Sequence, residues 1–221
     1  MRGFVLKGSH AYVMTNCEGG GFALHHLNTY NGEVLASHEF YEMDGNKALG
    51  LSGSSDALYG YLYIASSLVD SVGGNTYDVS AASNVLVQFS MTDLSVISIG
   101  AQAGSDYELD TLSVILYPLA TSTTLKHFVI RHGNNGNRTA LHFSSFSDNV
   151  LLTNTGCTDS ANCAYCSSLT LSHCGICNAA LFLFNGVCAA SAATFTTAYA
   201  DGTDMNPCYY SCDSCSGPAR N

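Results

Sequence analysis

The sequence carries little charge, and most of the charge it has is negative. Only 11% of its 221 residues are charged, with 7 Lys and Arg against 17 Asp and Glu, so the formal net charge is −10 at pH 7. Nucleic acids and anionic membrane surfaces are bound through clustered Lys and Arg, and this balance argues against both as partners. A surface with so few charges needs glycans for its solubility, or it is covered in an assembly.

Long apolar runs are also missing. No stretch approaches the roughly 18 apolar residues of a membrane-spanning helix, so we expect no direct membrane insertion. Met1–Lys7 carries positive charge but no apolar segment long enough for a secretory signal peptide. In a chain of extracellular composition this suggests a piece of a longer secreted protein, or a true start upstream of Met1. Residence in the cytosol is the alternative.

Catalytic signatures are missing as well. The motifs H-E-x-x-H, G-x-S-x-G and the P-loop do not occur, so we expect no enzyme, no cofactor and no metal. His25 and His26 are adjacent, and on a strand they point to opposite faces and do not share a metal. Two Gly-containing loops hold oxygen ligands of the kind calcium favours, but solvated turns are the favoured interpretation. Their residues are Asp70, Asn75 and Asp78, and Asp201, Asp204 and Asn206.

Helical periodicity is not seen over any three turns, whereas strand patterns recur up to about residue 152. Short runs rich in Val, Ile, Tyr, Phe and Thr are separated by turns of Gly, Asn, Asp and Ser, which is typical of β-strands. The predicted strands are Gly3–Lys7, Ala11–Asn16, Phe22–Leu27, Val34–Phe40, Tyr59–Ser66, Asn84–Ser90, Ser95–Ile99, Ser113–Pro118, Thr124–Arg131, Thr139–Ser144 and Asn149–Thr153.

An internal repeat of the form strand, turn, strand is visible at residues 23–35, 84–97 and 139–151. The repeat resembles the outer hairpins of β-propeller blades, but three units are too few to close a ring. The chain therefore forms either an incomplete propeller or a sandwich. The alternative is that the three segments align only because any all-β sequence aligns with itself in this way. An incomplete propeller leaves open sheet edges, which invite pairing with another chain.

Aromatic residues alternate along one predicted strand. Tyr59, Tyr61 and Tyr63 lie two residues apart, so their side chains share one face of the strand. Such a face is either part of the hydrophobic core or an interface, and the core is favoured.

Nine of the ten cysteines fall between Cys157 and Cys215. Two C-x2-C pairs can supply a zinc site, but only seven residues separate them here, against about 15 to 20 in zinc ribbons. Five further cysteines would also stay unexplained. A redox C-x2-C is disfavoured because no βαβ pattern surrounds either pair. Dense disulfides, which are typical of extracellular domains with small cores, account for the whole segment.

The end of this segment resembles the furin-like, growth-factor-receptor type of cysteine-rich repeat. The run from Cys208 to Pro218, C-Y-Y-S-C-D-S-C-S-G-P, is similar to the signature of that family, and Phe182–Cys188 is similar to its turn before a cysteine. The chain departs from the family at Ala192, where a second cysteine is usual. The resemblance implies an extracellular spacer without chemistry.

The same resemblance implies disulfides Cys163–Cys174 and Cys166–Cys177. A furin-like repeat would also continue beyond Cys212 and Cys215, so their partners are expected beyond Asn221 or in a neighbouring molecule. All ten cysteines are expected to form disulfides: Cys17, Cys157, Cys163, Cys166, Cys174, Cys177, Cys188, Cys208, Cys212 and Cys215.

Two further positions bear on an extracellular location. Cys17 stands alone in the β region, and three roles are open for it: a buried thiol, a bond to Cys157, or a bond to another subunit. The bond to Cys157 is favoured because it gives the odd cysteine of the segment a partner. Asn137 begins an N-x-T glycosylation motif just after a Gly- and Asn-rich turn, where an acceptor is exposed.

These patterns predict an all-β chain. A hairpin-repeat domain at residues 1–153, partly propeller-like or a sandwich, precedes a small disulfide-rich module of furin-like or EGF-like type at residues 154–221. The expected function is an extracellular or cell-surface structural glycoprotein whose copies assemble into a filament, a flagellar hair or a coat. Flagellar-hair (mastigoneme) and protist surface proteins, which this chain resembles, combine the same two parts.

Two other functions stay open: a receptor or adhesion ectodomain that binds a protein or glycan, and a secreted hydrolase with a cysteine-rich tail. The expected partner is the protein itself, with glycans as a further partner. Contacts between copies are expected at the N-terminal strand and at the final segment Cys208–Asn221. The residues are Gly3, Phe4, Val5, Leu6, Lys7, Tyr209 and Tyr210.

Overall fold

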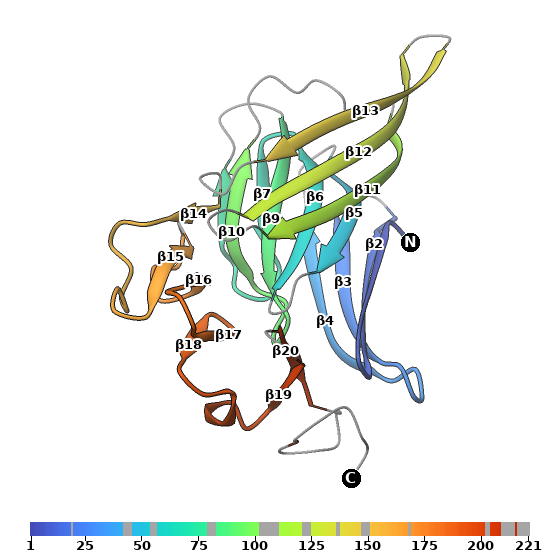
Figure 1. Cartoon of the computed structure of the whole chain (residues 1–221). Helices are drawn as coiled ribbons and strands as arrows, with labels where there is room; N and C mark the ends of the chain where they lie inside the picture. The colour runs from blue at the N-terminus through green and yellow to red at the C-terminus, as the bar shows by residue number, and fades with distance from the viewer. Residues whose placement is uncertain are drawn as a thin grey trace.

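The chain has an all-β fold, and the strands that the computed structural model describes pair in an antiparallel manner (Figure 1). The structure describes residues 1–18, 20–41, 46–53, 57–78, 83–101, 111–120, 125–135, 138–146, 151–167, 169–201, 204–208 and 215. Within these residues the one helical element is a 3-10 turn, Ala192–Thr194. No helix in the described part of the chain has the length and apolar character needed to cross a membrane.

Two larger sheets form the first hundred residues. The six-stranded sheet has the order β1 (Gly3–Lys7), β2 (His10–Asn16), β3 (Phe22–Asn28), β4 (Val34–Tyr41), β7 (Ser67–Asp70) and β8 (Thr76–Asp78). The four-stranded sheet has the order β10 (Val96–Ala101), β9 (Ser83–Ser90), β6 (Ala57–Ile64) and β5 (Lys47–Gly53). A three-stranded sheet follows, β11 (Thr111–Ala120), β12 (Leu125–Asn135) and β13 (Arg138–Phe146), with β11 beside β5.

The inner faces of the two larger sheets pack on one hydrophobic core, so this part of the chain is a sandwich. Alternate residues of the six-stranded sheet, among them Met14, Phe22 and Phe40, meet residues such as Leu62 and Phe89 of the four-stranded sheet. The Phe22 and Phe40 rings stack with centroids 4.7 Å apart. The period of two that places every second side chain inside a sheet thus decides which residues become core.

Strand β1 belongs to this sandwich. It forms a hairpin with β2 through the two-residue turn Gly8-Ser9, with Lys7 opposite His10. The strand lies close on β5, because a Cβ atom added to Gly3 would come within 2.2 Å of the Leu51 Cβ. The contacts between copies that the sequence predicts for this strand therefore cannot use the edge that meets β2.

The predicted repeat is correct for two of its three copies. Its first two copies are hairpins, β3–β4 and β9–β10, but they lie in different sheets. The third copy is wrong within the described residues, because β13 pairs with β12, whereas β14 (Leu152–Thr153) pairs with β15 (Cys163–Ser167). Residues 147–150 lie outside the description.

Three turns between consecutive strands share one hydrogen-bond pattern. Asn28, Asp70 and Ser90 each accept a backbone N–H at i+4 and donate their own N–H to the carbonyl at i+5. Each side chain also accepts the N–H at i+2. The residue at i+4 has positive φ in all three turns: 74° at Gly32, 65° at Gly74 and 62° at Leu94. Leu94 is not a glycine, so a positive φ costs conformational free energy there. Its side chain is fully buried in the core.

The predicted strands all overlap observed ones, with ends shifted by up to a few residues. Among residues 1–153 the sequence does not predict β5, β7 and β8, and it predicts none of the short strands of the C-terminal part. The β5 sequence, K-A-L-G-L-S-G, contains two glycines and lacks β-branched and aromatic residues, so its composition is unlike that of a strand. It is a strand because it pairs along its length with β6.

The C-terminal part contains only short ladders. β15 pairs with β16 (Cys174–Cys177), β17 (Phe182–Phe184) with β18 (Val187–Ala189), and β19 (Ala198–Asp201) with β20 (Asp204–Pro207). In Figure 1 these elements run down one side of the sandwich and then pass beneath it.

Candidate functional site

Four disulfides hold the C-terminal part together: Cys157–Cys166, Cys163–Cys174, Cys177–Cys188 and Cys208–Cys215. The loops they close are short, between 7 and 11 residues in sequence separation. Cys163, Cys166, Cys174 and Cys188 are buried against one another and form a small core of sulfur. A segment that buries little apolar surface is stabilised in this way.

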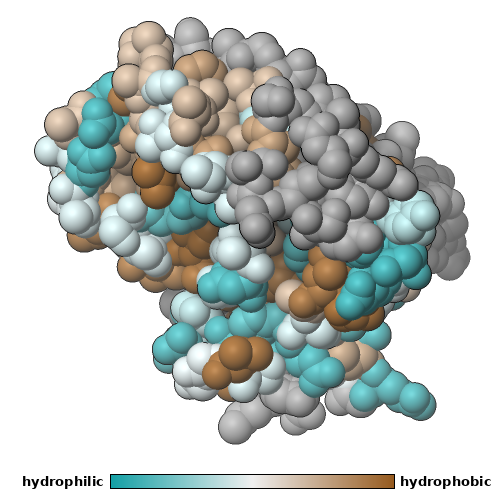
Figure 2. Space-filling model, turned by 90° about the horizontal axis from the view of Figure 1, so that it is seen from below, coloured by the Kyte–Doolittle hydropathy of each residue, from teal (hydrophilic) through white to brown (hydrophobic). Residues whose placement is uncertain are grey.

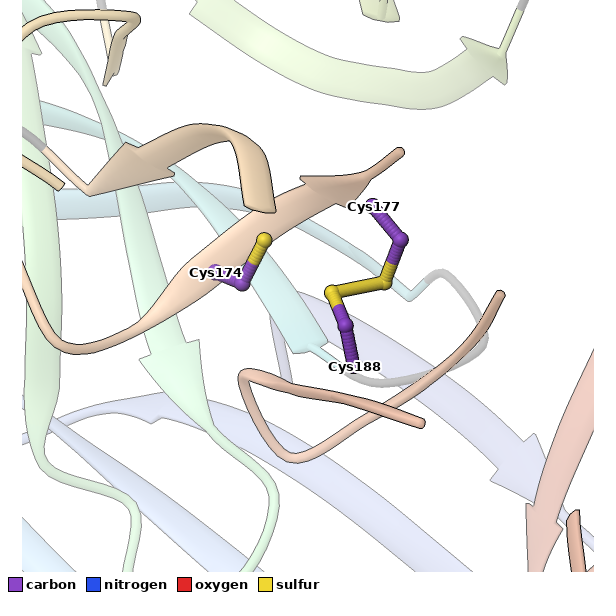
Figure 3. Close-up of side chains that lie close together, drawn as sticks. All are labelled: Cys174, Cys177 and Cys188. Atoms are coloured by element: carbon purple, nitrogen blue, oxygen red, sulfur yellow. A yellow bond between two sulfur atoms is a disulfide. The ribbon is translucent and has the colours of Figure 1, made fainter. Parts of the chain in front are cut away.

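Three sulfurs lie close enough together to suggest a metal centre. The Sγ atoms of Cys174, Cys177 and Cys188 lie within 4.8 Å of one another (Figure 3). Zinc binds cysteine as the thiolate, and here Cys177 is bonded to Cys188 and Cys174 to Cys163. The oxidised cluster therefore has no thiolate for a metal among these three residues.

The bonds correct two of our expectations. Cys163–Cys174 is one of the two pairs that the furin-like resemblance implies, but Cys166 bonds Cys157 rather than Cys177. Cys17 is a free, exposed thiol, so the favoured bond between Cys17 and Cys157 is wrong. Cys215 has its partner, Cys208, inside the chain. Cys212 lies outside the described residues.

The tyrosine face of β6 is where the cysteine-rich part packs on the sandwich. Tyr59 and Tyr61 are buried on the outer face of the four-stranded sheet, with Tyr63 partly buried beside them. They contact Leu151 and Leu152 together with Tyr165 and Ile176 of the module. The shared face predicted for the three tyrosines is thus an internal contact between the sandwich and its module.

Two buried serines fix this contact. The Ser167 hydroxyl donates to the Ile97 carbonyl at 2.6 Å and accepts the backbone N–H of Thr170 at 3.0 Å. The Ser98 hydroxyl lies 2.7 Å from the Ser167 oxygen and 3.1 Å from the Leu151 carbonyl, so its single proton has two acceptors. Both serines are fully buried, and each hydroxyl has a partner in the other element. Nothing in the sequence singled them out.

The far end of the module returns to the start of the chain. His10 Nε2 lies 2.9 Å from the carbonyl oxygen of Cys208, and His10 Nδ1 lies 2.6 Å from His26 Nε2. A carbonyl oxygen only accepts, so Nε2 of His10 carries a proton and Nδ1 accepts from His26 when both rings are neutral. The ring of Tyr12 stacks on His26, with centroids 4.6 Å apart.

Burial, and then the proximity of His10, lower the pKa of His26 from 6.5 to about 4. The neutral ring is therefore the stable form at this site at neutral pH. Its neighbour His25 points to the other face, where Ser37 Oγ lies 2.9 Å from its Nδ1. The two adjacent histidines thus lie on opposite faces of the strand and do not share a ligand, in agreement with the sequence.

A second buried polar pair closes the turn between β7 and β8. His38 Nε2 contacts the Asp70 carboxylate, which also accepts the backbone N–H groups of Val72 and Gly73. Burial alone would raise the pKa of Asp70, but the hydrogen bonds from His38 and from the backbone outweigh it, so the pKa is lowered. The sequence makes Asp70 a candidate calcium ligand, whereas in the structure its carboxylate accepts hydrogen bonds from His38, Val72 and Gly73. In the second candidate loop, Gly202 and Thr203 lie outside the described residues.

Exposed apolar side chains concentrate on the six-stranded sheet. Phe4 and Leu6 of β1 are 49% and 59% exposed, and Tyr30 in the β3–β4 turn is 63% exposed. Val34 and Leu35 follow in β4, and Val72 lies in the turn after β7. Figure 2, which views the molecule from below, shows hydrophobic patches separated by hydrophilic ones.

In the part of the chain that the structure describes, no strand pairs with the outer edges of that sheet. Within the described residues β1 pairs only with β2, and β8 pairs only with β7. The four-stranded sheet differs, because β11 lies beside β5 and the module contacts β10 through Ser98 and Ile97. The interface residues predicted in β1 therefore lie at an exposed edge, whereas Tyr209, Tyr210 and the glycosylation site Asn137 lie outside the described residues.

Comparison with known proteins finds no family model, no curated protein and no solved structure that matches this chain.

Proposed function

We propose that this protein is an extracellular structural protein whose copies assemble with one another through the six-stranded sheet. The observation that carries the proposal is that, among the described residues, no strand pairs with the outer edges of β1 and β8, in a sheet that also exposes Phe4 and Leu6. Sheet edges with exposed hydrophobic side chains pair with other chains unless charge, proline or a covering element prevents it.

The disulfide module supports both the location and the mechanical role. Four disulfides in one short segment are typical of an oxidising compartment. The module contacts the sandwich at Ser98 and Ser167 and again at His10 and Cys208. Because the module is fixed to the sandwich at two places, the subunit can resist mechanical force. The assembly that we propose is a filament, a flagellar hair or a surface coat.

Sedimentation velocity over a hundredfold range of concentration tests this proposal. The full chain is used with its disulfides intact, in salt of about 0.15 M. The proposal expects the weight-average sedimentation coefficient to rise with concentration and to fall again on dilution. A single monomer species at every concentration would sink the proposal.

An adhesion role is the second candidate, and Tyr30 favours it. This exposed aromatic residue lies in the β3–β4 turn beside the amide of Asn31, and such pairs of groups are suited to protein or glycan surfaces. A glycan array probed with the wild type and with Tyr30→Ala tests it. Equal or no binding by the two proteins would discard this role.

A further inference from the structure

We infer that the six-stranded sheet continues from one copy to the next, with β1 of one copy paired antiparallel to β8 of its neighbour. The inference rests on the self-assembly proposed above and names the surfaces that carry it. Its grounds are the direction of the strands, the groups their backbones present at the edge, and the charges beside them.

The direction of the strands permits this pairing. The sheet has six strands, and every neighbouring pair is antiparallel, so β1 and β8 run in opposite directions. A second copy placed beside the first in the same orientation brings its β1 against β8 as an antiparallel strand. The contact is heterologous, and repetition of one such contact propagates as an open assembly instead of closing a dimer.

The backbone groups at the two edges also match. Ser9 and Cys17 bond toward β3, through Thr29 N–H to Ser9 O and Cys17 N–H to Gly21 O. Bonding alternates along antiparallel strands, so the even residues of β2 bond to Gly3, Val5 and Lys7 of β1. The N–H and C=O groups of Phe4 and Leu6 then point to the open edge.

The same reasoning applies to β8. Asp70 N–H bonds to Asn75 O, so Leu68 and Tyr77 form the next bonded pair. The backbone groups of Thr76 and Asp78 then point away from β7, and both residues are exposed. Each edge therefore presents to a new strand the donors and acceptors of two alternate residues, Phe4 and Leu6 in β1 and Thr76 and Asp78 in β8.

Side-chain faces and charge select one register. Val5 packs toward the core, as Tyr77 does, whereas Phe4 and Asp78 are exposed. If Tyr77 of one copy lies opposite Gly3 of the next, the side chains of both strands keep their inner and outer faces, and Thr76 and Phe4 exchange backbone hydrogen bonds. Asp78 then lies opposite the exposed Arg2, whose own backbone N–H donates to the Met14 carbonyl oxygen. A carboxylate directly opposite a guanidinium stabilises a strand pair, and in a chain with only 7 basic residues this match is specific.

A charge-swap experiment tests the register. Arg2→Asp, Asp78→Arg and the double variant are compared with the wild type by sedimentation velocity of the full, oxidised chain. Each single reversal places like charges opposite each other and is expected to raise the dissociation constant about three- to fivefold, as exposed ion pairs contribute little individually. The double variant restores an opposite pair and is expected to return to within about twofold of the wild type.

Glu33→Arg is the matched control, because this exposed acid lies in the β3–β4 turn, away from both edges. Its dissociation constant should equal that of the wild type. If the wild type assembles but the double variant is no better than the single ones, or if Glu33→Arg weakens assembly as much as Asp78→Arg, the β1–β8 pairing is wrong and self-assembly stands. A wild type that stays monomeric overturns both.

Discussion

His10 Nε2 lies 2.9 Å from the carbonyl oxygen of Cys208, a residue 198 positions later in the chain. This hydrogen bond joins the first hairpin of the sandwich to the last described disulfide. The sequence predicts contacts between copies at the final segment Cys208–Asn221. The Cys208 carbonyl oxygen instead contacts His10 of its own chain, so this end of the module packs back on its own sandwich.

His10→Ala should release the end of the module without unfolding the sandwich. The variant loses a buried hydrogen bond to the Cys208 carbonyl, which costs about 1 to 3 kcal/mol locally. Hydrogen exchange followed by mass spectrometry should show faster exchange in residues 204–208 and unchanged exchange in β6 and β9. His25→Ala is the control, because His25 lies on the outer face of the same sheet. Equal effects of the two variants would contradict a specific role for His10.

Stability should fall as the pH drops from about 6.5 to about 4. The unfolded chain binds a proton at His26 over this range, whereas the folded chain binds it only below a pKa of about 4. Since the unfolded state then binds more protons, the free energy of unfolding decreases with falling pH, by about 1 to 3 kcal/mol after allowance for solvent.

The difference between wild type and His26→Gln isolates this effect. Urea unfolding at pH 7 and at pH 4 should show a larger loss for the wild type than for the variant. His25→Gln should behave as the wild type. A wild type and a His26→Gln variant that lose the same stability would show that His26 does not carry the effect.

Asp70→Ala should destabilise the fold by about 2 to 3 kcal/mol at pH 7, since it removes the partner of the buried His38 and the acceptor for two backbone N–H groups. The stability from a carboxyl with lowered pKa is present above its ordinary pKa of about 3.9 and is lost as the pH falls through the folded value. The deficit of the variant should therefore narrow below about pH 4. Ser90→Ala, in the equivalent turn of β9–β10, should cost only about 1 kcal/mol. Urea titrations of both variants measure the difference, and equal costs would be inconsistent with the account.

The disulfide pattern can be checked by counting thiols in paired variants. Cys177→Ser with Cys188→Ser removes one complete bond and should expose no new thiol. Cys166→Ser with Cys177→Ser should expose two new thiols, on Cys157 and Cys188, because these residues lose their partners. Mass measurement after alkylation without reductant gives the count. The opposite result, with no new thiols in the second variant, would restore the pairing Cys166–Cys177.

The sequence predicted the all-β class because short runs rich in Val, Tyr and Phe, such as those of β2 and β9, and the turn residues between the runs are visible without a structure. It did not predict β5, since a strand with two glycines and no β-branched residue has little intrinsic strand preference and forms through its pairing with β6. It could not predict the disulfide partners of Cys166 or Cys177, because the spacing of cysteines does not determine which of them meet in space. Ser98, Ser167, His10 and Cys208 were missed for the same reason: their contacts join residues 69 and 198 positions apart.

The account's central claim, that copies assemble by continuing the six-stranded sheet, is tested most directly by electron microscopy of the full, oxidised chain at high concentration. Neighbouring strands in a sheet are about 4.8 Å apart, so six strands per copy predict a repeat of about 29 Å along the direction of assembly. Filaments with that repeat, which no longer form when Phe4 and Leu6 are both replaced by Lys, are the expected result. Dispersed monomers at every concentration, or filaments of the same repeat from the Phe4→Lys, Leu6→Lys variant, would contradict it.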